Sequence, residues 1–355
     1  MAFVLVGDPK KPRFFAIADR RIVRRQTCAE GLLDQQADRF VLFSGPRVDH
    51  ARGPGLLLSF VVLSLERRMP LVLDRSAGRL APSGSVPLAI DFSGITPDRL
   101  AGRSAGEIAR LPIVADERPC LIGDVCAVQG TADDGRIECR GDFSRVHWLA
   151  AGMQWGEVVV SGAVGRHAGE GMTGGRLRIG GDAGDWLAAE LAGGTVHVMG
   201  DAGDNTAGAL PGSQHGMRGG MVLVEGHVGS LAGARMRRGI LAVGSGCGPA
   251  AAFELRAGTV FVIGKLGPQA GLGMRRGSLI AATTRPEIPP LFRRGALWLP
   301  TFLPLLAASL RRAGWQTVRS LGDAFGQPWQ QWHGDPLAGG RGEILYRGGL
   351  DAAVS

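Results

Sequence analysis

Seven glycines recur at an almost fixed interval through the middle of the chain. The intervals between them are 19, 19, 26, 19, 19 and 19 residues, and the glycines are Gly156, Gly175, Gly194, Gly220, Gly239, Gly258 and Gly277. Apolar residues stand two and four places after each glycine, and a large aliphatic residue stands three places before it. Alternation at +2 and +4 is typical of a strand with one buried face. A period near 20 residues is typical of stacked repeats. The sequence therefore predicts an all-β fold, a parallel β-helix with 19-residue coils.

The rest of the chain divides around these repeats. Residues 69–134 are expected to form a short N-terminal α/β head, 135–282 the β-helix repeats, and 283–355 a C-terminal capping helix and tail. Residues 1–68 show no repeat and hold 12 Lys and Arg against 7 Asp and Glu. Two interpretations of 1–68 stay open. It is either an accessory domain or upstream DNA translated by mistake, with Met69 as the true start.

Both ends of the repeat region carry local signals. In the head, Thr96 directly before Pro97 and a capping box of Ser104 with Glu107 predict two helix starts. After the repeats, an apolar helix over 301–313 is expected to cover the open end of the coils through its apolar side chains, which are Phe302, Leu303, Leu305, Leu306 and Leu310. The tail is expected to pack on a neighbouring molecule through four aromatic residues, which are Trp315, Trp329, Trp332 and Tyr346.

Composition limits the classes of function. The five cysteines, at 28, 120, 126, 139 and 247, have neither zinc nor iron–sulfur spacing. They are interpreted as free thiols in a reducing cytoplasm, which is the expected location of the protein. No run of 18 apolar residues exists, so no membrane span is expected. The net charge of +8 favours an anionic partner. We expect neither a membrane nor a nucleic acid as that partner.

Candidate catalytic residues are few. The histidines never pair at ligand spacing, and His197, between Val196 and Val198, is interpreted as a solvated outward-facing side chain. Four aspartates recur in the motif GDAGD, where paired carboxylates could serve glycoside hydrolysis or simply accept backbone N–H groups in turns. Turn formation is the favoured interpretation for all four, which are Asp182, Asp185, Asp201 and Asp204. No residue set supplies a nucleophile with a base, or a metal site with an open position, so no catalytic residue and no metal ligand is expected.

One constellation goes beyond the building of coils. Two places before the last four repeat glycines stand arginines, which should stack at roughly 4.8 Å: Arg218, Arg237, Arg256 and Arg275, with Arg238 and Arg276 beside them. Three interpretations stay open. They are solvated side chains, a docking surface for an acidic partner, or a guide for an anionic cofactor arm. The extra seven residues of the 26-residue interval fall in 204–215, a candidate binding loop that contains Asn205 and His215.

Several motifs together resemble a known family. They are DFSGITPDRLAG at 91–102, the insertion at 204–215, MRRG at 236–239 and 274–277, and GRGEIL at 340–345. With the glycine-spaced repeats, this pattern resembles the C-type subunit of formylmethanofuran dehydrogenase, and more specifically its counterpart in the formyltransferase/hydrolase complex of methylotrophic bacteria. It is also similar to the β-helical C-terminal domain of the glutamate synthase large subunit. The resemblance covers about 91–345 and implies a right-handed β-helix.

The resemblance also implies a function. It is that of a non-catalytic scaffold subunit in one-carbon metabolism, within a complex that converts formyl-tetrahydromethanopterin to formate. The implied partners are a formyltransferase subunit, an amidohydrolase-like subunit and a third subunit. The complex would use a methanofuran-type carrier and tetrahydromethanopterin, and this chain alone would bind no cofactor. The alternatives are the C-type subunit of a redox-active formylmethanofuran dehydrogenase, or a glutamate synthase-type β-helix protein. An acyltransferase would show an aliphatic residue every sixth position, which the 19-residue frame does not fit.

Overall fold

In the computed structural model, the structure describes residues 2–6, 13–17, 40–44, 61–63, 70–75 and 88–350. The chain forms two units, Met1–Arg68 and Met69–Ser355. In the first unit four strands form an antiparallel sheet in the order β2-β1-β3-β4. Their bounds are β1 Ala2–Val6, β2 Arg13–Ile17, β3 Phe40–Ser44 and β4 Val61–Leu63. The two interpretations of 1–68 concern residues that lie largely outside the described ones.

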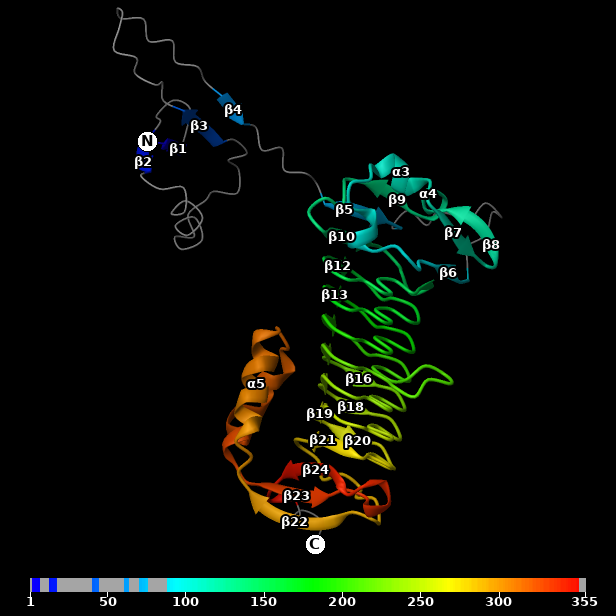
Figure 1. Cartoon of the computed structure of the whole chain (residues 1–355), viewed down its shortest axis with the longest axis vertical. Coiled ribbons are helices and arrows are strands. Elements are labelled where there is room, and N and C mark those ends of the chain that lie inside the picture. The colour runs from blue at the N-terminus through cyan, green and yellow to red at the C-terminus, as the bar shows by residue number, and fades with distance from the viewer. Residues whose placement is uncertain are drawn as a thin grey trace, which may run out of the picture. The chain divides into compact units, whose positions relative to one another are not determined.

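The second unit is built on one long sheet of strands contributed by successive repeats. Neighbouring repeat strands pair in parallel and in register, so that Val158, Leu177 and Val196 are aligned partners. Figure 1 shows the resulting stack of turns, one above the next. The repeat strands are β10 Arg136–Arg140, β12 Glu157–Val160, β13 Arg176–Ile179, β14 Thr195–Val198, β15 Met221–Val224, β17 Ile240–Val243, β19 Thr259–Val262 and β21 Arg276–Ala281. The described part of the chain is mostly strands with few helices, which confirms the all-β class.

The core lies inside the stack. The residues at −3, +2 and +4 from each repeat glycine are buried, with Met153, Val158 and Val196 at 0% exposure. A second line of contacts on another side of each turn consists of short bridges, such as Phe143 to Val164, and of three short parallel strands. Those strands are β16 His227–Val228, β18 Gly246–Cys247 and β20 Lys265–Leu266. Each turn therefore buries its apolar residues only by lying between its neighbours.

The aspartates of the GDAGD motifs join one turn to the next. The Oδ1 of Asp182 accepts the N–H of Asp201 at 2.8 Å, and the Oδ1 of Asp185 accepts that of Asp204 at 3.0 Å. One turn further on, Asp201 accepts the N–H of His227 at 2.6 Å. The interpretation that these carboxylates satisfy backbone groups at turns is confirmed.

The repeat glycines are required by close approach of the preceding turn. Gly194 has a φ of +83°, and a Cβ there would lie 2.6 Å from the carbonyl oxygen of Gly175. We expect Gly194→Ala to lower the free energy of unfolding by about 2–4 kcal/mol, because a left-handed residue costs roughly 1–2 kcal/mol and the clash adds to it. Gly212 is the matched control, since its φ is +80° but nothing lies within 4 Å of its Cβ position. Chemical denaturation of both variants measures the difference, and equal losses would contradict the steric argument.

The head covers the N-terminal end of the stack. β10 pairs in parallel with β5 Leu71–Asp74, which pairs antiparallel with β9 Ala127–Gln129. A small sheet has the order β11-β6-β7-β8. Its strands are β6 Ile90–Asp91, β7 Pro112–Ala115, β8 Arg118–Leu121 and β11 Val146–His147, and the helices of the head are α2 Pro97–Leu100, α3 Ala105–Ala109 and α4 Ile122–Val125.

Both predicted helix starts in the head exist, but only one has a side-chain cap. The capping box is confirmed, because the hydroxyl of Ser104 accepts the N–H of Glu107 and the carboxylate of Glu107 accepts the N–H of Ser104. Thr96 precedes α2 without a capping hydrogen bond, so its predicted capping role is wrong.

The predicted capping role of the C-terminal helix is also wrong. β24 Arg341–Arg347 adds the next layer to the sheet, with Gly342 aligned to Gly277. β23 Trp329–His333 and β22 Arg293–Trp298 follow it in antiparallel pairing. The helix α5 Phe302–Arg312 and the 3-10 helix η1 Thr317–Gly326 lie instead beside the stack (Figure 1). A short 3-10 helix, η2 Pro336–Ala338, precedes β24.

The reason lies on the outward face of the sheet. The residues at +3 from the last four repeat glycines are apolar and buried: Leu223, Ala242, Phe261 and Ile280. Leu303, Leu306 and Leu310 of α5 pack in one cluster with this stripe, while Leu305 is 73% exposed. The tail likewise packs on its own chain and not on a neighbour, since Trp315, Trp329 and Tyr346 are at most 1% exposed and Trp332 packs against the core.

Candidate functional site

The predicted arginines occupy equivalent places in successive turns. The N–H of Arg237 donates to the carbonyl of Met217 at 2.8 Å, that of Arg256 to Met236 at 2.9 Å, and that of Arg275 to Leu255 at 2.7 Å. These bonds place the three arginines one layer apart. Together with their neighbours they line a cleft of about 420 Å³, formed by Arg237, Arg238, Arg256, Ala257, Arg275 and Arg276.

Most of this positive charge is not neutralised. No side-chain hydrogen bond or ion pair involves the exposed arginines within the described ranges, and these are Arg218, Arg237, Arg238, Arg275 and Arg276. Neighbouring like charges at a separation near 4 Å cost about 1 kcal/mol each in water. A surface of this kind favours an anionic group at the cleft.

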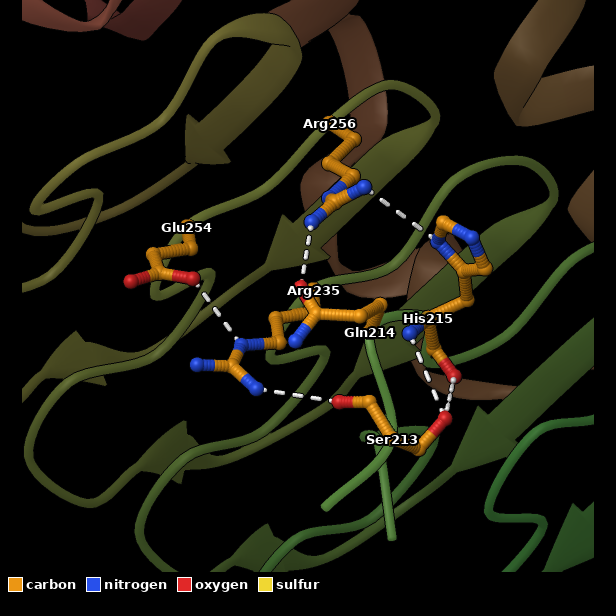
Figure 2. A network of polar contacts seen from close by, with 6 residues as sticks. All are labelled: Ser213, Gln214, His215, Arg235, Glu254 and Arg256. Carbon is orange, nitrogen blue, oxygen red and sulfur yellow. Dashed lines mark hydrogen bonds and ion pairs between the residues drawn. The ribbon is translucent and has the colours of Figure 1, made fainter. Parts of the chain in front are cut away.

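Arg256 is held by the loop of the long interval. Its guanidinium donates to Oε1 of Gln214 at 3.2 Å and lies 3.4 Å from Nδ1 of His215. Arg235, one turn earlier in the stack, pairs through Nε with Glu254 at 2.9 Å and donates through a second nitrogen to the carbonyl of Ser213 at 2.9 Å. Figure 2 shows how these contacts fasten the loop to the side of the stack. His215 therefore lies at the arginine cleft.

The other predicted loop residue lies at a different cleft. Asn205 contributes to a hollow of about 300 Å³ whose lining also includes Trp186, the loop residues 209–212 and Phe253. Arg218 lines neither cleft. The predicted set therefore divides in two, with five arginines and His215 in one place and Asn205 in another.

The histidines differ from their predicted role. His197 does face outward from β14, but it is only 6% exposed, and its Nε2 lies 2.8 Å from Oε1 of Glu225. The interpretation of His197 as a solvated side chain is wrong, because the segment after α5 covers it. Glu225 also accepts the backbone N–H groups of Gln316 at 2.8 Å and of Thr317 at 2.9 Å, and the hydroxyl of Thr317. This contact holds the C-terminal arm to the sheet.

Nucleophilic and metal chemistry find little support in the described residues. Burial raises the pKa of the Cys139 thiol, and it raises that of Cys247 to about 12, which keeps both thiols protonated and weakly nucleophilic. No cluster of three His, Cys, Asp or Glu side chains suited to a metal occurs in that part of the chain. None of its helices has the length and apolarity that crossing a bilayer requires. The arrangement is suited to binding.

Comparison with known proteins agrees with this assessment. No protein-family model matches the chain. A chain in the crystal structure of the formyltransferase/hydrolase complex from Methylorubrum extorquens, determined with methylofuran, is similar with a TM-score of 0.68 and 33% identity. The similarity covers 78% of this chain and 99% of that one. The C-type subunit of a molybdenum-containing formylmethanofuran dehydrogenase from Methanosarcina barkeri is 31% identical over 92 residues. The chain belongs to the family of formylmethanofuran dehydrogenase C-type subunits.

The archaeal match is partial. It covers 25% of this chain and spans about a third, 31%, of the archaeal protein. The match to the bacterial complex, by contrast, covers nearly the whole length of one of its solved chains.

Sequence reasoning missed one feature of this family member. The hollow at Asn205 also contains Leu231 and Trp186, which stand 26 and 19 residues on either side of Asn205. The signal that could have found it is the same repeat interval, applied to residues between the glycines.

Proposed function

We propose that this chain is the non-catalytic scaffold subunit of a formyltransferase/hydrolase complex in one-carbon metabolism, which converts formyl-tetrahydromethanopterin to formate. The observation that carries the proposal is the similarity to nearly the full length of one chain of such a complex, at 33% identity and a TM-score of 0.68. The formyltransferase subunit, the amidohydrolase-like subunit and a third subunit would be the partners.

The fold proposed for this scaffold is a right-handed parallel β-helix with 19-residue coils. Support comes from the parallel, in-register pairing of every repeat strand and from the second line of bridges in each turn. Within it we assign 69–134 to the head, 135–282 to the coils and 283–355 to the C-terminal helix and tail.

The carriers follow from the proposed complex. A methanofuran-type carrier and tetrahydromethanopterin would act in the complex, and the related bacterial complex was determined with methylofuran. This chain alone would bind neither, since its described residues offer an arginine surface and no enclosed, mostly apolar cofactor site.

A redox-active formylmethanofuran dehydrogenase is the second candidate. The 31% identity to the C-type subunit of an archaeal molybdenum enzyme favours it, over a segment of 92 residues. The two candidates differ in metal content and in reaction. An affinity-tagged chain, expressed in its native host, should co-purify three other subunits that release formate without an electron acceptor. Molybdenum in the purified complex, with dye-coupled formate production, would favour the second candidate.

Removing the arginine charge tests the function of the cleft. Replacing Arg218, Arg237, Arg256 and Arg275 together by Gln leaves the core untouched, so thermal stability should hold or rise slightly as repulsion is removed. If the cleft docks an acidic partner, co-purification should weaken at least tenfold and lose most of its salt dependence. If it guides an anionic cofactor arm, the complex should stay intact while turnover falls. Unchanged assembly and turnover would leave the arginines as solvated side chains.

The control for this variant carries the same change of charge elsewhere. Arg176, Arg178, Arg311 and Arg312 are exposed and lie outside the cleft. Their joint replacement by Gln should leave both assembly and turnover unchanged. A similar loss in both variants would mean that net charge, and not the cleft, controls assembly.

A further inference from the structure

One corner of the stacked turns carries a column of equivalent side chains. Its members share a positive φ between 55° and 61°, and they are Trp148, His167, Trp186, Asn205, Leu231, Ala250 and Gln269. Each of the first six donates its N–H to the carbonyl of the residue just before the next member, at 2.8 to 3.0 Å. One member per turn places neighbouring members about 4.8 Å apart.

The first three members form a stack of rings. The ring centroids of Trp148 and His167 are 4.9 Å apart with an angle of 13° between the planes, and those of His167 and Trp186 are 5.1 Å apart with an angle of 6°. The Nδ1 of His167 lies 2.5 Å from a carboxylate oxygen of Glu170, which fixes the orientation of the middle ring. The stack ends at Trp186, because the next member is Asn205, whose side chain is too short to form a ring layer.

The missing layer is a cleft. Trp186, Asn205 and Leu231 contribute to the hollow of about 300 Å³, and loop residues 209–212 form another wall. Trp186 and Leu231 are two layers apart, about 9.6 Å. An aromatic ring midway between them would lie about 4.8 Å from each, within the 4.5–7 Å range of aromatic pairs. The side chain of Asn205 forms no hydrogen bond to other described residues, so its amide can bind a polar group on the edge of such a ring.

The cleft adjoins the unneutralised arginines. Arg235 and Phe253 line it, and they precede Arg237 and Arg256 of the arginine cleft by two and three residues. The same loop serves both places, since 209–212 form a wall of one cleft while Gln214 contacts Arg256 at the other. A segment that carries an aromatic side chain beside acidic residues is complementary to both.

We propose that the cleft between Trp186 and Leu231 binds an aromatic side chain of a partner subunit, and that acidic residues next to that side chain pair with Arg237 and Arg256. The proposal rests on the proposed function in one respect, the assembly of other subunits on this chain. The size of the cleft supports a single ring, and an aromatic anchor in a pocket beside charged contacts is a common arrangement in protein interfaces.

The variant Asn205→Trp tests the cleft by filling the missing layer. The column already holds Trp at 148 and 186 with the same backbone conformation, so the variant should fold and melt at or above the wild-type temperature. Binding of indole to the full chain, measured by saturation-transfer NMR, should weaken at least tenfold in Asn205→Trp. Ala250→Trp adds a Trp to the same column outside the cleft and should bind indole like the wild type. Equal binding by the wild type and Asn205→Trp, or no binding by the wild type, would overturn the proposal.

The complex provides the second arm of the test. Asn205→Trp should weaken co-purification of partner subunits at least tenfold, while Ala250→Trp should not. Wild-type recovery of partners by Asn205→Trp would overturn docking at this cleft. If even the wild-type chain recovers no partner, the proposed function fails, and the indole measurement still decides whether the cleft accepts a ring.

Discussion

Replacing Val196 with Asp should eliminate soluble protein. Val196 is fully buried in β14 between its aligned partners Leu177 and Val222 on the adjoining strands. A carboxylate there has no charged or hydrogen-bonding partner, and burying an unpaired ion costs several kcal/mol, comparable to the whole stability of a domain, about 5–15 kcal/mol. The layers above and below use the same backbone bonds, so the strand cannot turn its side chain outward. The soluble fraction after expression measures the effect.

The control places the same residue on the other face of the sheet. Arg178 lies on the adjoining strand, is aligned with His197 and is exposed. Arg178→Asp should remain soluble and lose at most about 1 kcal/mol, which is the span of strand propensities. Wild-type melting of Val196→Asp would refute the assignment of the +2 residues to the interior.

Replacing Glu225 with Ala should release the C-terminal arm while the stack stays folded. The carboxylate of Glu225 accepts bonds from His197, Gln316 and Thr317, and its side chain is 10% exposed. Removing one partner of a buried pair costs about 3–5 kcal/mol, which corresponds to a hundredfold or greater increase in opening. Hydrogen exchange should therefore accelerate about a hundredfold in 315–326, and protection of β12 and β13 should not change. Uniform loss of protection along the chain would contradict a local role.

The same contact predicts a dependence on pH. Burial by itself raises the pKa of the Glu225 carboxyl, but the hydrogen bonds from Thr317, Gln316 and His197 outweigh it and leave the pKa below its ordinary value of 4.5. A carboxyl with a lowered pKa in the folded state stabilises that state above its unfolded pKa and ceases to do so as pH falls through the folded value. Protection of 315–326 should hold at neutral pH and decline below about pH 4.5. In Glu225→Ala this decline should be weaker.

Much of the interior could be predicted because the repeat interval fixes it. One period assigns Met153, Val158 and Val196 to the core, and it aligns Arg237, Arg256 and Arg275 in adjacent layers. The same period contains the signal that was missed, since the +3 residue changes from Arg178 and His197 to Leu223 and Phe261. An outward position that becomes apolar needs a cover, which predicts an arm along the side of the sheet rather than a cap at its end.

The clefts could not be predicted in the same way. The arginine cleft depends on the path of the loop that carries Gln214 and His215, and loop conformation follows from contacts distant in sequence. The ring column requires Trp148, His167 and Trp186 to adopt positive φ, a conformation that such residues seldom take. Only the backbone bonds between turns impose it, and these exist only in the assembled stack.

The apolar stripe on the outside of the sheet also has a consequence for biosynthesis. Leu223 leaves the ribosome 80 residues before Leu303, the first buried residue of the helix that covers the stripe. At roughly 5–20 residues per second, about 4–16 s pass between the two. During that interval the nascent chain presents a ladder of apolar side chains at strand spacing, the surface that recruits chaperones or a second nascent chain. Synonymous codons that slow translation between 283 and 302 should therefore raise aggregation without changing a single residue of the folded protein.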